Sequence, residues 1–384
     1  LTSDVRWKAD IAENIYCLIP GVDPELKNEM VILEAFYDSS VNVAGLSPGA
    51  DEACGIATLL AFARIMKERP PQKTVLIVAS AGHAQTLSGM REFVWAISER
   101  SKTVKLMKRS LKSRIKKTRQ TISGLENLSF EKNIFPEPSV MPLLDEAIKE
   151  RLKTEADGIS RQLMQLRLET DQPADSETIK KLAGMRQLLR RLTWRTSYQS
   201  KDLTLEEIRL LEQIAAKATK DNKAVLLDIE QQLLLIEDVD RLRRHTREYE
   251  LAASVSLHLS SHGTGFGAFN YGWMFPFRPR INRVSSYSRL DEALRLAGET
   301  TEQELGITDF FKDTLRPSRQ GSWQSFFVDQ PPLGGELTAI AGYHGLSFVT
   351  THDARAFWGT ASDTLEKMDR PYALQQAAVV CGIM

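Results

Sequence analysis

Residues 28–90 read NEMVILEAFYDSSVNVAGLSPGADEACGIATLLAFARIMKERPPQKTVLIVASAGHAQTLSGM. Two apolar runs, 30–38 and 73–80, flank residues 52–68, whose apolar side chains recur every three or four positions, as in a helix. The run 73–80 is continuous and rich in β-branched residues, which is typical of a central strand covered on both faces. This strand–helix–strand order predicts an α/β fold with helices layered against a sheet.

The segments on either side of this stretch extend the same alternation. Residues 11–20 alternate as a strand, and the turn residues of 21–24 lead toward the run 30–38. We therefore expect 11–20 and 30–38 to form a hairpin. A helix is expected to begin at Arg91, after the loop that follows the second apolar run.

The middle of the chain has a different pattern. Residues 101–248 have almost no strand signal, and their apolar residues step by three and four over long distances. Thr204 and Glu207 have the spacing of a helix capping box. We expect three or four long helices, arranged as an antiparallel bundle or coiled-coil arm. This all-α segment is expected to be an insertion in an α/β domain that comprises residues 1–100 and 249–384.

The α/β pattern resumes after the insertion. Residues 249–263 predict a strand, and 264–285 predict an irregular loop rich in Gly, Pro and aromatic residues. Residues 288–299 predict a helix, and 346–351 predict a further strand. The chain ends in the segment 360–384, which predicts a helix.

Composition limits the function classes. Hydrophobic residues make up 42% and charged residues 26%, the formal net charge is zero, and no apolar run is long enough to span a bilayer. Nothing therefore predicts recruitment to nucleic acid or membrane by overall charge. Cys17, Cys54 and Cys381 lie in apolar contexts, and we expect all three to be small buried hydrophobes. The chain starts at Leu1, so we expect a processed or excised piece, with any targeting or membrane segment outside it.

Several phrases resemble the M28 family of metallopeptidases, the zinc aminopeptidase class. They are VILEAFYD (31–38), PGADEACGIATLLAFARIM (48–66), KTVLIVASAGHAQTLSGMREFV (73–94) and TASDTLEKMD (360–369). The resemblance covers roughly residues 11–100 and 250–384. It implies a three-layer zinc-exopeptidase-like fold, in which a mixed central sheet is flanked by helices, and it favours the extracytoplasmic side of a membrane.

The resemblance also implies positions for two zinc ions and a general base. The family uses two histidines, a bridging aspartate, a glutamate and a second carboxylate as ligands, and a further glutamate as the base. Here these positions fall on Phe36, Asp51, His83 (the base position), Ala84, Ser260 (to within a residue or two) and Gly359. The side chains of Phe, Ala and Gly carry no lone pair, and zinc takes three or four protein ligands. We therefore expect a vestigial site, with no zinc and no other cofactor.

Two rebuilt sites are alternatives. The first is a relocated metal site that joins Asp51 and His83 to one of His258, His262, His344 and His352. The second is a metal-free hydrolase that pairs Asp51 and His83 with Ser260 or Ser261. The competing interpretation is that these are hydrogen-bonded or solvated loop histidines. His258 and His262 lie on a predicted strand, where four residues span roughly 13 Å, so they cannot share an ion.

Three other segments have a functional and a plain interpretation. Residues 101–120 carry nine Lys or Arg and no acid, which predicts either a solvated helix face or a contact with anionic lipid or an acidic surface. Nucleic acid is not expected there, because aromatic residues are missing. The segment 266–277, FGAFNYGWMFPF, is either a pocket lid or partner contact, or a cover of the core. Gly263, Gly265 and Gly267 indicate a turn, because the context of a phosphate-binding loop is missing.

These patterns together favour a catalytically inactive, M28 peptidase-like module. It would bind a protein partner through the helical segment 101–248. The alternative is a metallo-aminopeptidase or amide hydrolase with a site rebuilt around Asp51 and His83. A third possibility is a membrane-proximal module that docks on lipid through its basic segment.

Overall fold

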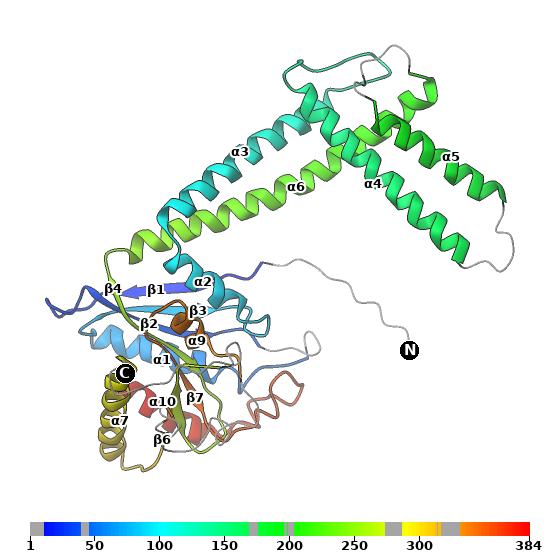
Figure 1. Cartoon of the computed structure of the whole chain (residues 1–384). Helices are drawn as coiled ribbons and strands as arrows, with labels where there is room; N and C mark the ends of the chain where they lie inside the picture. Colours follow the sequence, from blue (N-terminus) through cyan, green and yellow to red (C-terminus); the bar gives the residue numbers. More distant parts are fainter. Residues whose placement is uncertain are drawn as a thin grey trace. The chain divides into compact units, whose positions relative to one another are not determined.

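A computed structural model describes residues 11–39, 46–168, 176–195, 198, 203–272, 286–312, 314–315 and 331–384. The chain divides into two compact units (Figure 1). We call Leu1–Glu99 with Leu242–Met384 the sheet unit, and Arg100–Arg241 the helical unit.

The sheet unit is built on a mixed sheet of seven strands, in the order β1-β3-β2-β4-β7-β5-β6. The central pairs β3–β2, β2–β4 and β4–β7 are parallel, whereas β1 and β5 run antiparallel to their neighbours β3 and β7. The strands are β1 (Ile15–Ile19), β2 (Glu29–Phe36), β3 (Thr74–Ser80), β4 (Glu250–His258), β5 (Phe266–Phe269), β6 (Phe311–Lys312) and β7 (Gly345–Thr350).

Two strand predictions need correction. β1 does not form a hairpin with β2 but pairs with β3, with Ile15 opposite Ala79 and Ile19 opposite Val75. The reason is that both sides of β2 are already occupied by the parallel partners β3 and β4. Residues 266–269, expected in an irregular loop, form β5, and the rings of Phe266 and Phe269 are fully buried. Residues 273–277 of the predicted lid lie outside the described residues.

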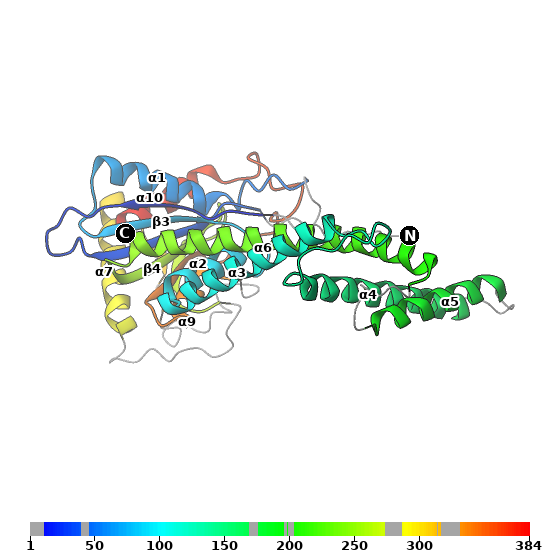
Figure 2. The ribbon, with the colours of Figure 1, turned by 90° about the horizontal axis from the view of Figure 1, so that it is seen from above.

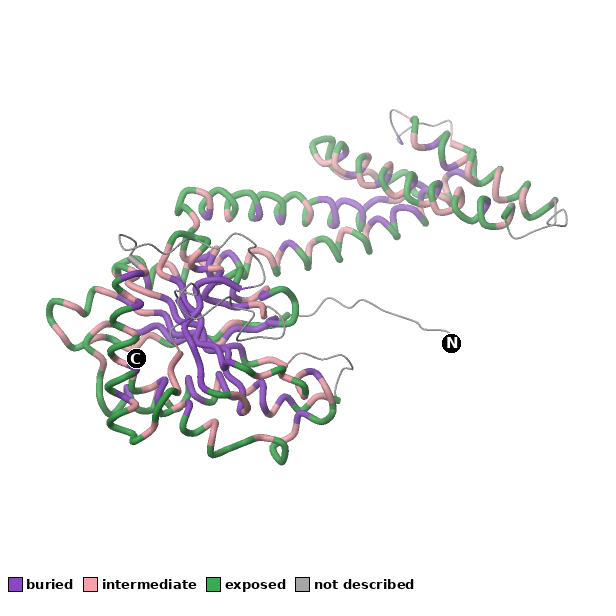
Figure 3. Tube along the Cα trace, turned by 60° about the horizontal axis from the view of Figure 1, so that its bottom comes forward, coloured by how far each residue is buried: buried purple, intermediate pink, exposed green. Residues whose placement is uncertain are grey.

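Helices cover both faces of the sheet, which gives the expected α/β layering (Figure 1). On one face lie α1 (Cys54–Glu68), α7 (Ser286–Leu305) and α10 (Arg370–Ile383), and on the other α2 (Ser88–Ser98) and α9 (Gly334–Ile340). The core under α1 contains Leu33, Ala35 and Leu257, and the buried strands form the centre of the unit (Figure 3). A Cβ on Gly55 would lie 2.5 Å from the Leu257 carbonyl oxygen, so only glycine lets α1 approach β4 this closely.

One cysteine prediction is wrong. Cys54 is buried and Cys381 is partly buried, but Cys17 is exposed. It lies on the edge strand β1, where alternate residues face outward because side chains alternate along a strand.

The described residues of the helical unit form four helices, whose arrangement can be followed in Figure 2. They are α3 (Ser101–Glu126), α4 (Met141–Leu168), α5 (Ser176–Thr193) and α6 (Leu205–Thr246), and the last residues of α6 belong to the sheet unit. The apolar residues predicted from their spacing form its core, including the fully buried Leu144, Ile148, Leu152 and Leu211. None of the helices in the described part of the chain is both long and apolar enough to cross a bilayer.

The predicted capping box of α6 is present. The Thr204 N–H donates to the Glu207 carboxylate at 2.9 Å, and the Glu207 N–H donates to Thr204 Oγ1 at 3.3 Å. The hydrogen bond from the Thr204 N–H lowers the pKa of Glu207, which keeps this carboxylate charged beside the positive end of the helix.

Candidate functional site

The candidate site lies where the parallel strands β2, β3 and β4 end. In α/β sheets, residues at the carboxyl ends of adjacent parallel strands converge on one edge. Phe36 ends β2 and His258 ends β4. His83 follows β3, and its backbone is fixed by Asp38, whose carboxylate accepts from the Gly82 N–H at 2.8 Å and the His83 N–H at 3.2 Å. Three side chains far apart in the sequence thus meet at this edge.

Four rings fill this position. The Phe36 and His83 rings stack at 3.9 Å between centroids and 20° between planes. The ring centroid of His258 lies 5.1 Å from that of His83 and 5.0 Å from that of Trp358. Phe36, His83 and His258 are only 4%, 7% and 2% exposed. We call these four residues the ring cluster, in which two imidazoles pack against a phenyl and an indole ring.

The two imidazoles of the ring cluster are neutral near pH 7. Burial, together with the positive charge of Arg355, lowers the pKa of His83 to about 4. Burial also lowers the pKa of His258 well below its usual value, and Arg355 and His83 act in the same direction. Both ring nitrogens of His258 are buried and have no hydrogen-bond partner among the described residues.

Asp51 lies beside the ring cluster and acts as a hydrogen-bond acceptor for the surrounding loops. Its Oδ1 accepts from the Ser261 N–H at 2.5 Å, and its Oδ2 accepts from Trp358 Nε1–H at 2.7 Å. The Cys54 thiol lies 3.9 Å from Oδ1, and the Asp51 N–H donates to Asp363 Oδ1 at 2.6 Å. Both carboxylate oxygens therefore have protein donors, and Asp51 is 3% exposed. This carboxylate ties together segments that are hundreds of residues apart.

Arg355 closes the outer side of the cluster. Its guanidinium lies 5.1 Å from the centroid of the Trp358 ring, in cation–π geometry. It also donates to the carbonyl oxygens of Thr350 and Asp353. Burial lowers its pKa to about 10, so it remains charged. A fixed positive charge here opposes both the protonation of His83 and the approach of a metal cation.

Residues 14–117 match Peptidase family M28. The matched segment runs from the start of the sheet unit into α3 and contains Phe36, Asp51 and His83. No curated protein matches the chain.

Solved aminopeptidase structures can be superposed on the chain at low similarity. Two structures of BSAP, a zinc aminopeptidase from Bacillus subtilis, align at 10% identity with TM-scores of 0.39 and 0.41. Each alignment covers 96% of this chain and 48% of the other. An aminopeptidase from Aneurinibacillus sp. strain AM-1 aligns at 10% identity with a TM-score of 0.41, over 96% of this chain and 46% of the other. The chain thus spans about half the length of these proteins.

The structure brings three of the predicted M28 site positions together. Phe36 and His83 stack within the ring cluster, and Asp51 reaches the same cluster through its bond to Trp358. Ser260 is fully buried, but its N–H donates to Thr350 Oγ1 and its hydroxyl donates to the His262 carbonyl oxygen. Ser260 therefore supports the loop rather than the cluster.

The other two predicted M28 positions, Ala84 and Gly359, place no side chain in the ring cluster. Ala84 is exposed on the loop after β3. Gly359 is buried with φ at +70°, a left-handed conformation that glycine adopts readily. That turn follows Trp358, whose ring belongs to the cluster. The sequence predicted neither Trp358 nor Arg355 as site residues, and it named Ser261 only as a possible nucleophile, whereas the structure uses its backbone N–H. The local signal for Trp358 and Ser261 was that each is adjacent to a predicted position, Gly359 or Ser260.

The residues present do not fit a zinc ion. Zinc needs three or four donors with free lone pairs. The M28-like positions supply one carboxylate, Asp51, whose two oxygens already accept hydrogen bonds, and one imidazole, His83, which is stacked on Phe36. Among the described residues, no group of three or more His, Cys, Asp or Glu side chains is placed to hold a metal. The described donor set thus gives no support to a relocated site at Asp51 and His83.

The hydrolase alternative also lacks a connected set of groups. No hydrogen bond joins Asp51 to His83 within the described residues. The Ser260 hydroxyl donates to a backbone carbonyl, and the Ser261 hydroxyl accepts from the Asp369 N–H. A serine nucleophile needs a base within hydrogen-bond reach. Two other candidate histidines contact groups outside the cluster: His352 Nδ1 lies 2.7 Å from Thr264 Oγ1, and His344 Nδ1 lies 3.1 Å from the carbonyl oxygen of Ala252 in β4.

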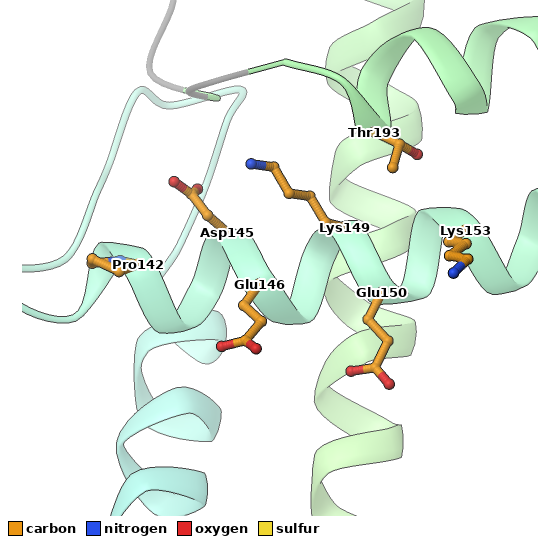
Figure 4. A pocket seen from close by; sticks show the side chains of 7 residues that line it. All are labelled: Pro142, Asp145, Glu146, Lys149, Glu150, Lys153 and Thr193. Carbon is orange, nitrogen blue, oxygen red and sulfur yellow. The ribbon is translucent and has the colours of Figure 1, made fainter.

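A concave feature lies on the helical unit (Figure 4). It is a groove of about 660 Å³ lined by Pro142, Asp145, Glu146, Lys149, Glu150, Lys153 and Thr193. All but Thr193 come from one side of α4, where three acids and two lysines are mixed. Burial raises the pKa of Asp145, while Lys149 opposes that change. Because the charges are mixed along one helix and do not converge on a point, we assign no chemistry to this groove.

Proposed function

We propose that this chain is a non-catalytic module with an M28 peptidase-like sheet unit, which binds another protein through its helical unit. The observation that carries the first part is the ring cluster. It places stacked side chains at the strand ends where the resemblance expects two metal ions, and Asp51 uses both oxygens on neighbouring protein donors.

The chemistry that such a site would need supports the same conclusion. Zinc-dependent hydrolysis requires a metal-bound water and a base that takes its proton near neutral pH. His83 occupies the base position, but its pKa of about 4 makes it a weak base, and its ring is buried against Phe36. The site thus lacks a base matched to that proton transfer.

The binding role rests on exposed apolar side chains of the helical unit. On α6, Leu227, Leu234 and Leu235 are 60%, 61% and 59% exposed, and the last two follow Leu227 by seven and eight residues. At 3.6 residues per turn they share one face of the helix, opposite the buried Ile229 and Ile236. An exposed row of leucines is typical of an interaction surface. The partner that fits it is a protein that presents an apolar helix face.

Metal content tests the non-catalytic part. Protein purified without added metal is expected to contain zinc well below stoichiometry, about 0.1 per chain or less, because too few donors are available. Elemental analysis of the folded protein measures this. Asp51→Asn should leave the low value unchanged. Near-stoichiometric zinc that falls in Asp51→Asn, or aminopeptidase activity that a chelator abolishes, would instead establish the enzymatic alternative at Asp51 and His83.

The binding part is tested by changing the α6 leucines. A variant with Leu227→Gln, Leu234→Gln and Leu235→Gln is expected to reduce recovery of a co-purifying partner at least about tenfold, because the apolar contact area is lost. The matched control changes three exposed leucines of the sheet unit, Leu60, Leu296 and Leu374, to Gln. Equal recovery with both variants would show that α6 is not the binding surface.

A further inference from the structure

The first helix of the helical unit is strongly basic. α3 has nine Lys or Arg between residues 101 and 120, and its first acid is Glu126. The whole chain carries equal numbers of acidic and basic residues. The positive charge of α3 is therefore local, and the question is which of its cations are neutralised within the protein.

Three of these cations face α6, which runs beside α3 (Figures 1 and 2). Lys108 Nζ and Lys112 Nζ lie 3.3 Å and 3.9 Å from Glu237 Oε1. Arg119 Nη2 lies 2.6 Å from Glu230 Oε1. The buried residues Val104, Leu111 and Ile115 lie on this inner side of the helix. The acids of α6 thus neutralise one side of α3.

The opposite side of α3 has no such neutralisation. At 100° per residue, five exposed cations lie within about 60° of one line along the helix. None of them has an ion pair with another described residue, and the exposed Leu106, at 54%, lies among them. We call these residues the outer basic face: Lys102, Lys105, Arg109, Lys116 and Lys117.

We infer that the outer basic face of α3 binds the anionic headgroups of a lipid bilayer. Its five cations span about 22 Å along the helix axis, so they can contact several headgroups at once. Like charges at Lys105 and Arg109, four residues apart, destabilise the free helix, and an anionic surface removes that repulsion. The apolar side chain of Leu106 can enter the interface between headgroups and acyl chains.

The composition of the face favours lipid over nucleic acid. Proteins that bind single-stranded nucleic acid place aromatic rings between their cations for base stacking. α3 has no aromatic residue, and its exposed uncharged side chains include Leu106 and Met107. A cationic face with aliphatic side chains is typical of helices that lie on a membrane surface.

Sedimentation with sucrose-loaded vesicles tests the inference on the full chain. Binding is expected to phosphatidylcholine vesicles that contain phosphatidylserine, to be lost in 0.5 M salt, and to be undetectable with pure phosphatidylcholine. Each cation near an anionic surface strengthens binding by about fivefold. The variant Lys105→Glu, Arg109→Glu, Lys116→Glu is therefore expected to weaken binding by at least about 100-fold. These three side chains are exposed and make no ion pair with a described residue, so the helix should persist in circular dichroism.

The matched control reverses three exposed lysines on other helices, Lys153, Lys180 and Lys220, with the same change in net charge. It should bind within about threefold of the parent protein. The inference is overturned if the parent does not bind anionic vesicles at low salt, or if the control loses as much as the α3 variant. Tighter binding of RNA than of vesicles, lost in the α3 variant, would assign the face to nucleic acid. Zinc content is measured separately, so this result does not depend on the proposed function.

Discussion

Replacement of Asp51 by alanine is expected to lower the free energy of unfolding by roughly 3 to 5 kcal/mol, which is a large part of the stability of most domains. The buried Ser261 N–H and the partly buried Trp358 Nε1–H would both lose a charged acceptor. Asp51→Asn keeps one carbonyl oxygen and should lose about half as much. Urea denaturation followed by circular dichroism and tryptophan fluorescence measures the change.

The matched control for Asp51 is Glu366→Ala. Glu366 is an exposed carboxylate in the same C-terminal loop region as Trp358. Its removal should change stability by less than about 0.5 kcal/mol. If Asp51→Ala were no more destabilising than Glu366→Ala, the carboxylate would not be holding the loops together. Asp51 would then be available as a metal ligand or a catalytic group.

Acidification from pH 6.5 to pH 4 is expected to destabilise the protein through His83, by about 3 kcal/mol. The pKa of His83 is about 4 in the folded protein and near 6.5 in the unfolded chain. Between these values the unfolded chain binds a proton that the folded chain excludes, so the free energy of unfolding falls as the pH falls. His258 contributes in the same direction. Urea denaturation at several pH values gives the profile.

His83→Phe isolates this effect. The phenyl ring retains the stack on Phe36 but cannot be protonated. The slope of the free energy of unfolding between pH 6.5 and pH 4 should therefore be smaller than in the parent. Burial raises the pKa of Glu34, which opposes the histidines because the folded state then binds the extra proton. Glu34 is present in both proteins, so its contribution cancels in the difference. Identical slopes would show that His83 is solvated or protonated in the folded state.

Local patterns were sufficient for most of the secondary structure. The strands β2, β3 and β7, the helix α1 and the long helices of the helical unit follow from spacing alone, since each buries a regular apolar face. The capping box at Thr204 and Glu207 was also predictable, because its partners are three residues apart.

Properties that depend on distant segments could not be predicted in this way. Strand pairing depends on which edges are occupied, so the position of β1 beside β3 was not evident from a nearby turn. The ring cluster joins residues 36, 83, 258 and 358, and neither the burial of His258 nor the role of Trp358 has a local signature. The resemblance to M28 placed Phe36, Asp51 and His83 at the site. Two partners of Asp51, Ser261 and Trp358, are each adjacent to a predicted position, Ser260 or Gly359.

The bonds of Asp51 also determine when during synthesis the sheet unit can be completed. They join residues separated in sequence by 210, 307 and 312 positions. At about 5–20 residues per second, a ribosome needs tens of seconds after Asp51 emerges before Trp358 is made. Until β4 (Glu250–His258) has been made, β2 lacks this partner, and an unpaired apolar strand edge invites aggregation. The segment that contains β2 is thus expected to depend on chaperones until β4 has been translated, and the bonds of Asp51 are complete only after Trp358 and Asp363.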